Sequence, residues 1–276
     1  MSDIEVLYED NHIIAVNKKP SDIVQGDRTG DVTLADHVRA YLRDKYHKPG
    51  NAFVGIPHRL DRPTSGVVIF ARTDKALERL SALFREGGVK KTYWAMVGER
   101  PAADSGELTH WLVRDPVANK SRAVRRPVTD AARPADTARA AREARLSYRV
   151  LFSLERYTLL EIELLTGRHH QLRRHMKHIA HPIVGDATHG KGQHNRLFQE
   201  KFGCHRLLLA AVSLSFRHPD DGRPVLLSTP PSTDFIDCIR RLGWTDWLGN
   251  VAPSSPSLPP RGEGGCSPLP PGEGQG

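Results

Sequence analysis

A run of five apolar residues at 67–71 (VVIFA) constrains the fold of this chain more than any other feature. It directly follows a polar nonet at 58–66 (HRLDRPTSG), whose Pro, Ser and Gly residues are typical of a loop between two elements. Apolar, β-branched residues after such a cluster indicate a buried strand. The nonet is therefore predicted to be a loop at one end of a sheet.

Asp61 lies in this loop between Arg59 and Arg62. Nearby positive charge keeps a carboxylate ionised, so Asp61 could serve as a nucleophile or as an anchor for the arginines. The same residues also fit a solvated turn with a surface ion pair, which is common and contributes little to stability. Local composition does not separate these two interpretations.

The nonet resembles the active-site motif of the RluA-type RNA pseudouridine synthases, His-Arg-Leu-Asp-x-x-Thr-Ser-Gly, and matches it at every fixed position. The resemblance implies that Asp61 is the catalytic carboxylate of an enzyme that isomerises uridine in RNA. Asp61 would attack the sugar or the uracil, or assist elimination. Arg59 would occupy the space left by the flipped base, with His58 and Arg62 beside it on the RNA.

Residues 91–97 (KTYWAMV) are predicted to form a strand. A tyrosine on a strand is usually a core or half-buried residue. Tyr93, however, matches the tyrosine of the family element Lys-x-Tyr-x-Ala. The resemblance implies that Tyr93 stacks on the uracil and accepts a proton from the ribose.

Residues 166–175 (TGRHHQLRRH) are predicted to turn into a very basic helix. They resemble the family element Thr-Gly-Arg-x-His-Gln-[Ile/Leu]-Arg-x-His. The resemblance implies that Arg168 pairs with Asp61 across the cleft and that Leu172 packs near the base pocket. Arg173 and Arg174 are expected to hold the RNA backbone.

A metal site is not expected on this helix, although His175 and His178 stand at i, i+3. No carboxylate or cysteine stands at ligand spacing, and Arg173, Arg174 and Lys177 would compete with a metal for the same space. Pseudouridine formation has no redox step, so the resemblance implies neither a metal nor another cofactor.

Charge favours a polyanionic partner, since 40 Lys and Arg against 32 Asp and Glu give the 276 residues a net charge of +8. The excess is concentrated at 168–206. Three dispersed cysteines support neither a disulfide framework nor a zinc site. No apolar run is long enough to span a membrane and the N-terminus lacks the features of a signal peptide, so we expect a cytoplasmic protein that acts as a monomer.

The resemblance implies an α+β fold, the pseudouridine synthase catalytic fold, in which a long, mixed, mainly antiparallel sheet with flanking helices carries a central RNA-binding cleft. The sequence predicts a catalytic domain over residues 1–250, with a basic insertion at about 116–145, and a disordered Pro- and Gly-rich tail over 251–276. Periodicity predicts a strand pair within 4–17 and strands at 146–154, 157–165, 207–216 and 224–227. It also predicts three helices, capped by Asp31 or Thr33, by Thr73 and by Thr233.

Further residues narrow the resemblance to the tRNA pseudouridine-65 synthase (TruC) branch. They are His189-Gly190 in place of the usual Tyr-Gly, the segment 206–211, and Leu242-Gly243-Trp244; Ala210-Ala211 departs from the usual His-Ala. Uridine 65 of tRNA is therefore the expected target. The alternatives are a family member that acts on ribosomal RNA or another tRNA uridine, and a non-catalytic RNA-binding protein. Glycoside hydrolysis is disfavoured, because it usually requires two facing carboxylates and only Asp61 stands out.

Overall fold

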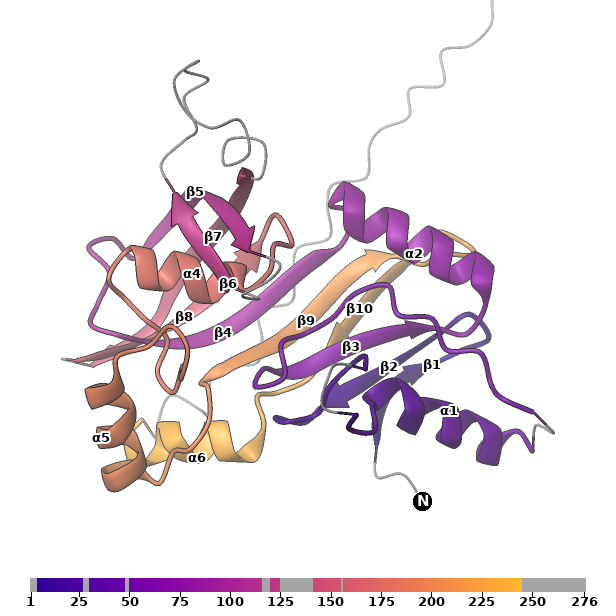
Figure 1. Ribbon diagram of the computed structural model, residues 1–276, viewed down its shortest axis with the longest axis horizontal. Helices are drawn as coiled ribbons and strands as arrows, with labels where there is room; N and C mark the ends of the chain where they lie inside the picture. The colour runs from indigo at the N-terminus through magenta and orange to yellow at the C-terminus, as the bar shows by residue number, and fades with distance from the viewer. Residues whose placement is uncertain are drawn as a thin grey trace, which may run out of the picture.

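The computed structural model describes residues 4–26, 30–47, 50–115, 120–124, 141–154 and 156–244. The predicted tail at 251–276 and most of the predicted insertion at 116–145 lie outside these ranges. Within them, ten strands form one sheet, in the order β1-β2-β3-β9-β4-β8-β7-β5-β6 with β10 paired to β9 (Figure 1). Of the strand pairs in this order, β3–β9 is parallel and the others are antiparallel. The predicted α+β class with a mixed, mainly antiparallel sheet is confirmed.

The first half of the sheet contains the strands predicted around the nonet. The bounds are β1 (Glu5–Glu9), β2 (Ile13–Lys18), β3 (Ser65–Ala71), β9 (Leu209–Arg217) and β10 (Pro224–Ser228). All seven residues of β3 are buried, as the apolar run predicts. Residues 58–64 therefore enter the sheet at the start of a fixed central strand.

The second half of the sheet contains β4 (Lys90–Gly98), β5 (Ser105–Asp115), β6 (Lys120–Val124), β7 (Ala141–Leu154) and β8 (Tyr157–Leu164). The strands predicted at 91–97, 146–154 and 157–165 are confirmed. β5 and β6 were not predicted. β7 extends back to Ala141, so residues 141–145 of the predicted insertion belong to the sheet.

Five helices lie among the described residues: α1 (Leu34–Lys45), α2 (Asp74–Glu86), α4 (Gln171–His178), α5 (Gly192–Phe202) and α6 (Thr233–Arg241). The side chains of Thr33 and Thr73 accept hydrogen bonds from the first turns of α1 and α2, as predicted. At α6 the capping position is Ser232 rather than Thr233. α5 was not predicted. No helix in these ranges is long and apolar enough to cross a membrane.

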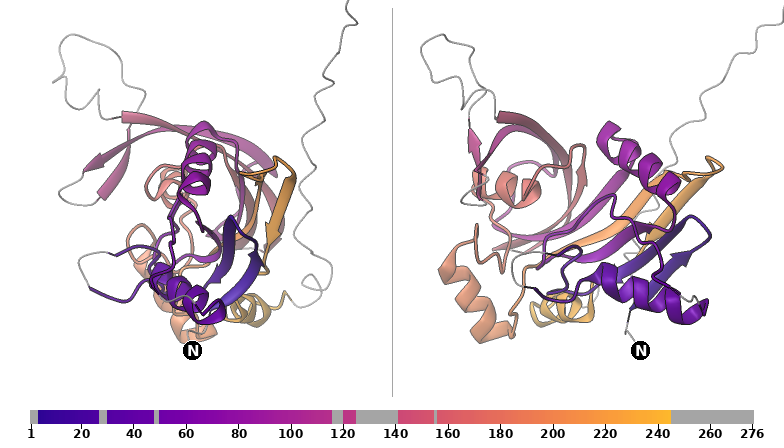
Figure 2. Two further views of the ribbon diagram at one scale, coloured as in Figure 1. Left: turned by 90° about the vertical axis from the view of Figure 1, so that its right-hand side faces the viewer. Right: turned by 45° about the vertical axis from the view of Figure 1, so that its right-hand side comes forward.

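The helices pack on different parts of the sheet. α1 and α4 contribute to one apolar cluster with the central strands, α2 to a second with β3, and α5 and α6 to a third below β4 and β9. Figure 2 shows the strands of the second half curling around α4, which lies next to β5 and β6. The sheet thus holds α4 opposite the loop that precedes β3.

The strand that follows the nonet joins the middle of the sheet through a short parallel contact between β3 and β9, in which Ser65 pairs with Ala210 and Gly66 with Ala211. Gly66 has φ 116, and a Cβ atom there would lie 2.0 Å from the carbonyl oxygen of Ala211. Only glycine fits this conformation and this close backbone approach. The last residue of the nonet therefore sets the distance between β3 and β9.

Gly66→Ala is expected to destabilise the protein by more than about 2 kcal/mol, because the substitution adds a backbone clash to the strain of a positive φ. Gly222→Ala is the matched control, since Gly222 has φ 72 but no atom within 4 Å of a Cβ. Urea denaturation of both variants measures the difference. Equal losses in the two variants would show that the close approach to Ala211 contributes nothing.

Candidate active site

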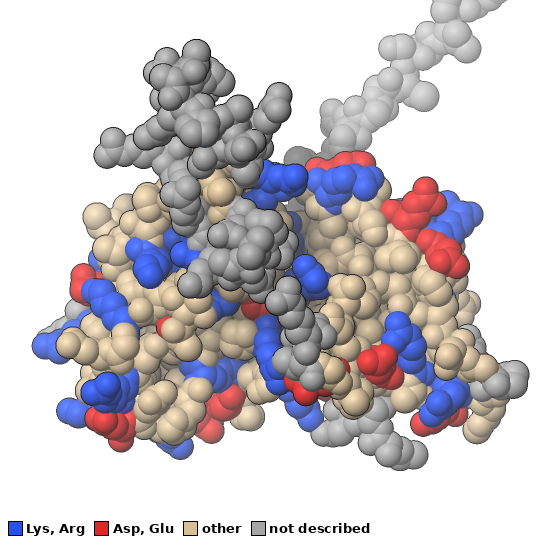
Figure 3. All heavy atoms as spheres, viewed as in Figure 1, with Lys and Arg blue, Asp and Glu red and all other residues tan. Residues whose placement is uncertain are grey.

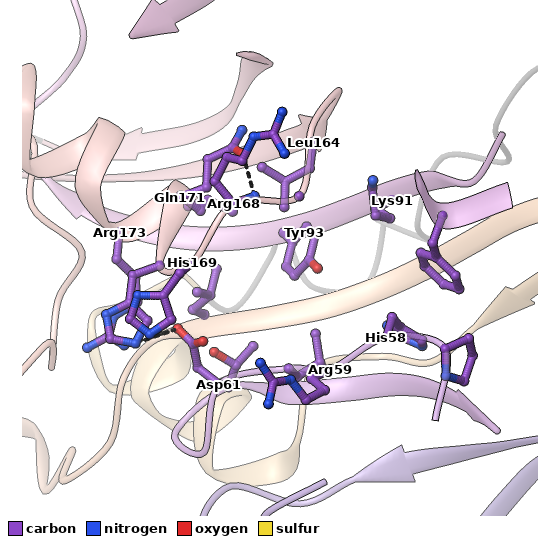
Figure 4. Close-up of a pocket in the computed structure, with 18 of the residues that line it drawn as sticks. His58, Arg59, Asp61, Lys91, Tyr93, Leu164, Arg168, His169, Gln171 and Arg173 are labelled. Atoms are coloured by element: carbon purple, nitrogen blue, oxygen red, sulfur yellow. Dashed lines mark hydrogen bonds and ion pairs between the residues drawn. The ribbon is translucent and has the colours of Figure 1, made fainter. Parts of the chain in front are cut away.

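A cavity of about 500 Å³ opens where the two halves of the sheet meet. It lies between the loop at 57–64, the side of β4 that carries Tyr93, and the turn at 167–170 that leads into α4 (Figure 4). Asp61 is the one acidic residue among those that line it. On the face seen in Figure 3, Lys and Arg side chains gather between the two halves of the sheet, as an RNA-binding cleft requires.

Lys18 holds the loop that carries Asp61. Its ammonium is fully buried and donates hydrogen bonds to the carbonyl oxygens of Arg62 and Thr64, both at 2.8 Å, and of Lys19 at 3.0 Å. A further bond runs within the loop, from the backbone N–H of Thr64 to the carbonyl of Asp61. Burial lowers the pKa of Lys18 to about 7, and the charges of Asp22 and Asp61 partly oppose that shift. Lys18 thereby fixes the backbone on the C-terminal side of Asp61.

Arg173 is the cation that contacts Asp61. Its Nη1 donates to Oδ2 of Asp61 at 3.0 Å, while Nε and Nη2 donate to the two carboxylate oxygens of Asp186 at 2.8 Å each. Arg173 is 5% exposed and the Asp61 side chain 27%. Burial alone would lower the pKa of Arg173, but its bonds to Asp186 and Asp61 raise it. A charged guanidinium is thus fixed on one carboxylate and directed at the other.

Asp186 is the buried anchor of this arrangement. Besides Arg173, it accepts hydrogen bonds from the backbone N–H groups of Thr188 and His189, at 2.9 and 2.8 Å. Burial would raise the pKa of Asp186, but the hydrogen bonds and charge of Arg173 lower it overall. Because Asp186 is more buried and better bonded than Asp61, it fixes the guanidinium and leaves Asp61 as the reactive partner.

The prediction that Arg168 pairs with Asp61 is wrong. Arg168 lies in the turn before α4, where its Nε donates to the carbonyl of Glu143 on β7 at 3.1 Å. Its backbone N–H donates to Oε1 of Gln171, which fixes the turn. Arg173, which lies within α4, reaches Asp61 instead. Arg168 still lines the cavity.

His170 is a second side chain of the turn before α4 that lies beside Asp61. Its Nε2 lies 3.7 Å from Oδ2 of Asp61, and its Nδ1 forms a 3.0 Å hydrogen bond with Nε2 of His189. Burial lowers the pKa of His170 to about 4, which the charge of Asp61 partly opposes, so the ring is neutral at pH 7. His170 has φ 51, a left-handed backbone that turns the chain into α4 and places the ring beside the carboxylate.

Tyr93 lies on β4 in the middle of the cavity and is 8% exposed. Burial raises the pKa of its phenol, and the nearby charge of Asp61 raises it further. The hydroxyl therefore keeps its proton at neutral pH. The predicted stacking on uracil and the predicted acceptance of a proton from the ribose stay predictions.

The structure places some of the other predicted site residues in the lining of the cavity and others outside it. His58, Arg59 and Leu172 line the cavity together with Asp61, Tyr93, Arg168 and Arg173. Arg62 forms a 3.0 Å ion pair with Asp31, and neither Arg62 nor Arg174 is among the lining residues. Contact of these two arginines with RNA stays a prediction. In the described part of the chain no group of His, Cys, Asp and Glu is arranged to hold a metal ion.

Sequence reasoning assigned no role to Lys18, His170 or Asp186. The burial of Lys18 was hidden by its place in a Lys-Lys pair that resembles a solvated strand end. The pairing of Asp186 with Arg173 crosses from one segment to another, and no local pattern reports it. His170 was part of the quoted family element, which was the one available signal.

The site and the fold together define an RNA-modifying enzyme, and comparison with known proteins agrees. The family model "RNA pseudouridylate synthase" matches residues 12–178. The chain belongs to this family of isomerases.

Among its relatives, the tRNA pseudouridine synthase C of Vibrio cholerae is 34% identical over an alignment of 259 residues, and the alignment covers 89% of this chain and 98% of that protein. The protein of the same name from Salmonella typhimurium is 34% identical over 89% of this chain and 92% of its own length. The structure of human RNA Pseudouridylate Synthase Domain Containing 4 has the same fold, with a TM-score of 0.72, 24% identity, and coverage of 87% of this chain and 93% of that one.

Proposed function

We propose that this RNA pseudouridine synthase converts uridine 65 of tRNA to pseudouridine. The observation that carries the proposal is the single carboxylate of Asp61, held by the buried Arg173 in a cleft lined by basic residues. Relatives that are 32–35% identical over most of the chain are named tRNA pseudouridine synthase C, which supports tRNA as the substrate.

The chemistry requires one positioned acid. The bond between N1 of uracil and C1′ of ribose breaks, the base rotates in the pocket, and C5 bonds to C1′. The proton of C5 passes to water, and N1 takes up one proton from water, so the product is an isomer of the substrate. Asp61 assists the first bond cleavage, and Arg173 keeps it ionised and directed. Tyr93 offers its ring to the base, and Arg59, on the exposed loop, fills the space that the flipped base leaves.

The proposed target is tested by tritium release from tRNA transcribed with [5-³H]uridine. The wild-type chain should release about one equivalent of tritium per tRNA, and a transcript with cytidine at position 65 should release none, because each conversion loses one C5 proton. A fragment of ribosomal RNA is the comparison substrate. Release from that fragment, or from the position-65 variant, would contradict uridine 65 as the target.

We further propose that the enzyme acts as a monomer in the cytoplasm. Asp61, Arg173 and Tyr93 meet in one cavity within a single chain, which supports a monomer as the active unit. Light scattering of the full chain, with and without tRNA, checks the oligomeric state: a stable dimer that dissociates only with loss of activity would contradict the proposal.

A further inference from the structure

The cavity has a second end, away from Asp61. Figure 4 shows Asp61 and Arg173 at one side, Tyr93 in the middle, and Lys91 and His58 at the other side. Arg85 and Phe84 of α2 also line this second end. The proposed reaction at Asp61 uses none of these residues directly.

Lys91 is a buried cation without a fixed anionic partner. It is 7% exposed and lines the cavity, yet its ammonium has no hydrogen bond or ion pair among the described residues. Burial lowers the pKa of Lys91, and the charge of Glu163 only partly opposes that shift. Burying an unpaired charge is costly, so the site is poised for an anionic ligand.

The neighbouring Lys90 shows the contrast. It lies on the same strand, but it forms a 3.0 Å ion pair with Glu163 and is not among the lining residues of the cavity. Lys90 is thus paired with an acid outside the cavity, whereas Lys91 has no such ion pair and faces the cavity.

His58 supplies a hydrogen-bond donor beside Lys91. Its Nε2 accepts a 3.0 Å bond from the backbone N–H of Ile69, and its ring stacks on Phe84 with centroids 4.3 Å apart. Burial and, to a smaller extent, the charge of the nearby Lys91 lower the pKa of His58 to about 3, so the ring is neutral at pH 7. A neutral ring that accepts at Nε2 must carry its proton on Nδ1, which leaves that N–H for a ligand.

The charged residues that line this end of the cavity are positive, and Glu163, whose charge acts on Lys91, is paired with Lys90 outside the cavity. Arg85 lies at its edge with an exposed side chain, and its nearest acid, Glu86, is 3.8 Å away and also exposed. Asp61, the one acidic lining residue, is held by Arg173 at the opposite end. A ligand that bonds both an ammonium and an imidazole N–H here must be an acceptor, and a negatively charged acceptor also compensates the buried charge of Lys91.

We propose that Lys91 and His58 form a phosphate-binding subsite, which binds a phosphodiester of the RNA strand next to the flipped uridine. Lys91 and Tyr93 are two residues apart on β4, which separates them by roughly 7 Å, within the reach of one nucleotide. With the base against Tyr93, a flanking phosphate therefore arrives at Lys91. This inference rests on the proposed function of the cavity.

The test compares the RNA affinities of several variants, using an RNA that the wild-type chain has been shown to modify. If the proposed function is wrong, the wild-type chain releases no tritium from this RNA, and that result is seen before any affinity is measured. Full-length chains carrying Asp61→Asn, with and without Lys91→Gln, are titrated with that RNA and with versions that hold one uncharged methylphosphonate linkage. The linkage is placed 5′ or 3′ of the target uridine, or three nucleotides away. Lys90→Gln is the matched control, because it removes the same charge outside the cavity.

Lys91→Gln should weaken binding of unmodified RNA about tenfold and reduce the slope of log K against log salt by about 0.7, whereas Lys90→Gln leaves binding within about twofold. With one of the flanking neutral linkages the Lys91→Gln difference should vanish. Lys91→Arg should bind within about threefold of the parent, which shows that charge rather than loss of packing is responsible.

Two results would overturn the subsite. One is unchanged binding by Lys91→Gln. The other is a Lys91→Gln loss that persists with every neutral linkage, which would place Lys91 on the base or in a structural role. If thermal unfolding shows that Lys91→Gln does not fold, the proposal is tested with the parent chain alone, which carries Asp61→Asn and an unchanged Lys91. It should bind RNA with one flanking neutral linkage about tenfold more weakly than RNA with the distant one, and equal binding would refute the proposal.

Discussion

Asp61→Asn is expected to lower the rate of tritium release from tRNA at least about 10⁴-fold while the protein stays folded and bound to RNA. The amide is nearly the same size and can still accept the hydrogen bond from Arg173, so the cavity keeps its shape. It cannot act as a nucleophile or stabilise positive charge at the sugar. Loss of a group that reacts directly costs many orders of magnitude in rate.

Single-turnover tritium release with excess enzyme measures this effect separately from product release. RNA affinity should stay within about threefold of wild type, because backbone electrostatics supply most of the binding free energy. Asp237→Asn, which alters an exposed ion pair with Arg240 on α6, is the matched control and should leave the rate unchanged. A rate for Asp61→Asn within tenfold of wild type would show that another group performs the chemistry.

The position of Asp61 could be predicted because it depends on local sequence. The apolar run of β3 follows the polar nonet directly, so a rigid strand with a functional loop at its start is encoded within a few residues. The capped helices α1 and α2 were predictable for the same reason. In each case hydrophobic periodicity and the capping residue agree.

The partner of Asp61 could not be predicted in this way. Arg168 and Arg173 are close in sequence, and the choice between them depends on where α4 begins and which way each side chain leaves the backbone. The bond from the Arg168 N–H to Gln171 and the left-handed backbone of His170 set that geometry. Neither is visible in a pattern of residue types.

Long-range packing also explains the elements that were missed. β5 contains polar residues that alternate weakly, and it forms a strand because β7 and β6 pair with it on either side. Tertiary pairing here overrides a weak local preference.

Arg173→Met is expected to destabilise the protein by about 3–5 kcal/mol, because it leaves the buried carboxylate of Asp186 without its cation. Since the free energy of unfolding of an ordinary domain is only about 5–15 kcal/mol, a large fraction of the variant molecules should unfold on mild heating. Urea denaturation measures this loss. Arg168→Met is the matched control, since the side chain of Arg168 bonds only to the carbonyl of Glu143 among its described contacts, and it should cost about 1 kcal/mol.

Stability and catalysis can be separated by combining Arg173→Met with Asp186→Asn. The second substitution removes the uncompensated buried charge, so the double variant should recover a large part of the lost stability. Activity should not recover, because Asp61 still lacks the guanidinium that holds it ionised and directed. Recovery of activity together with stability would mean that Arg173 only supports the fold. A greater loss of activity in the stable Arg168→Met variant than in the double variant would assign the role of partner to Arg168 after all.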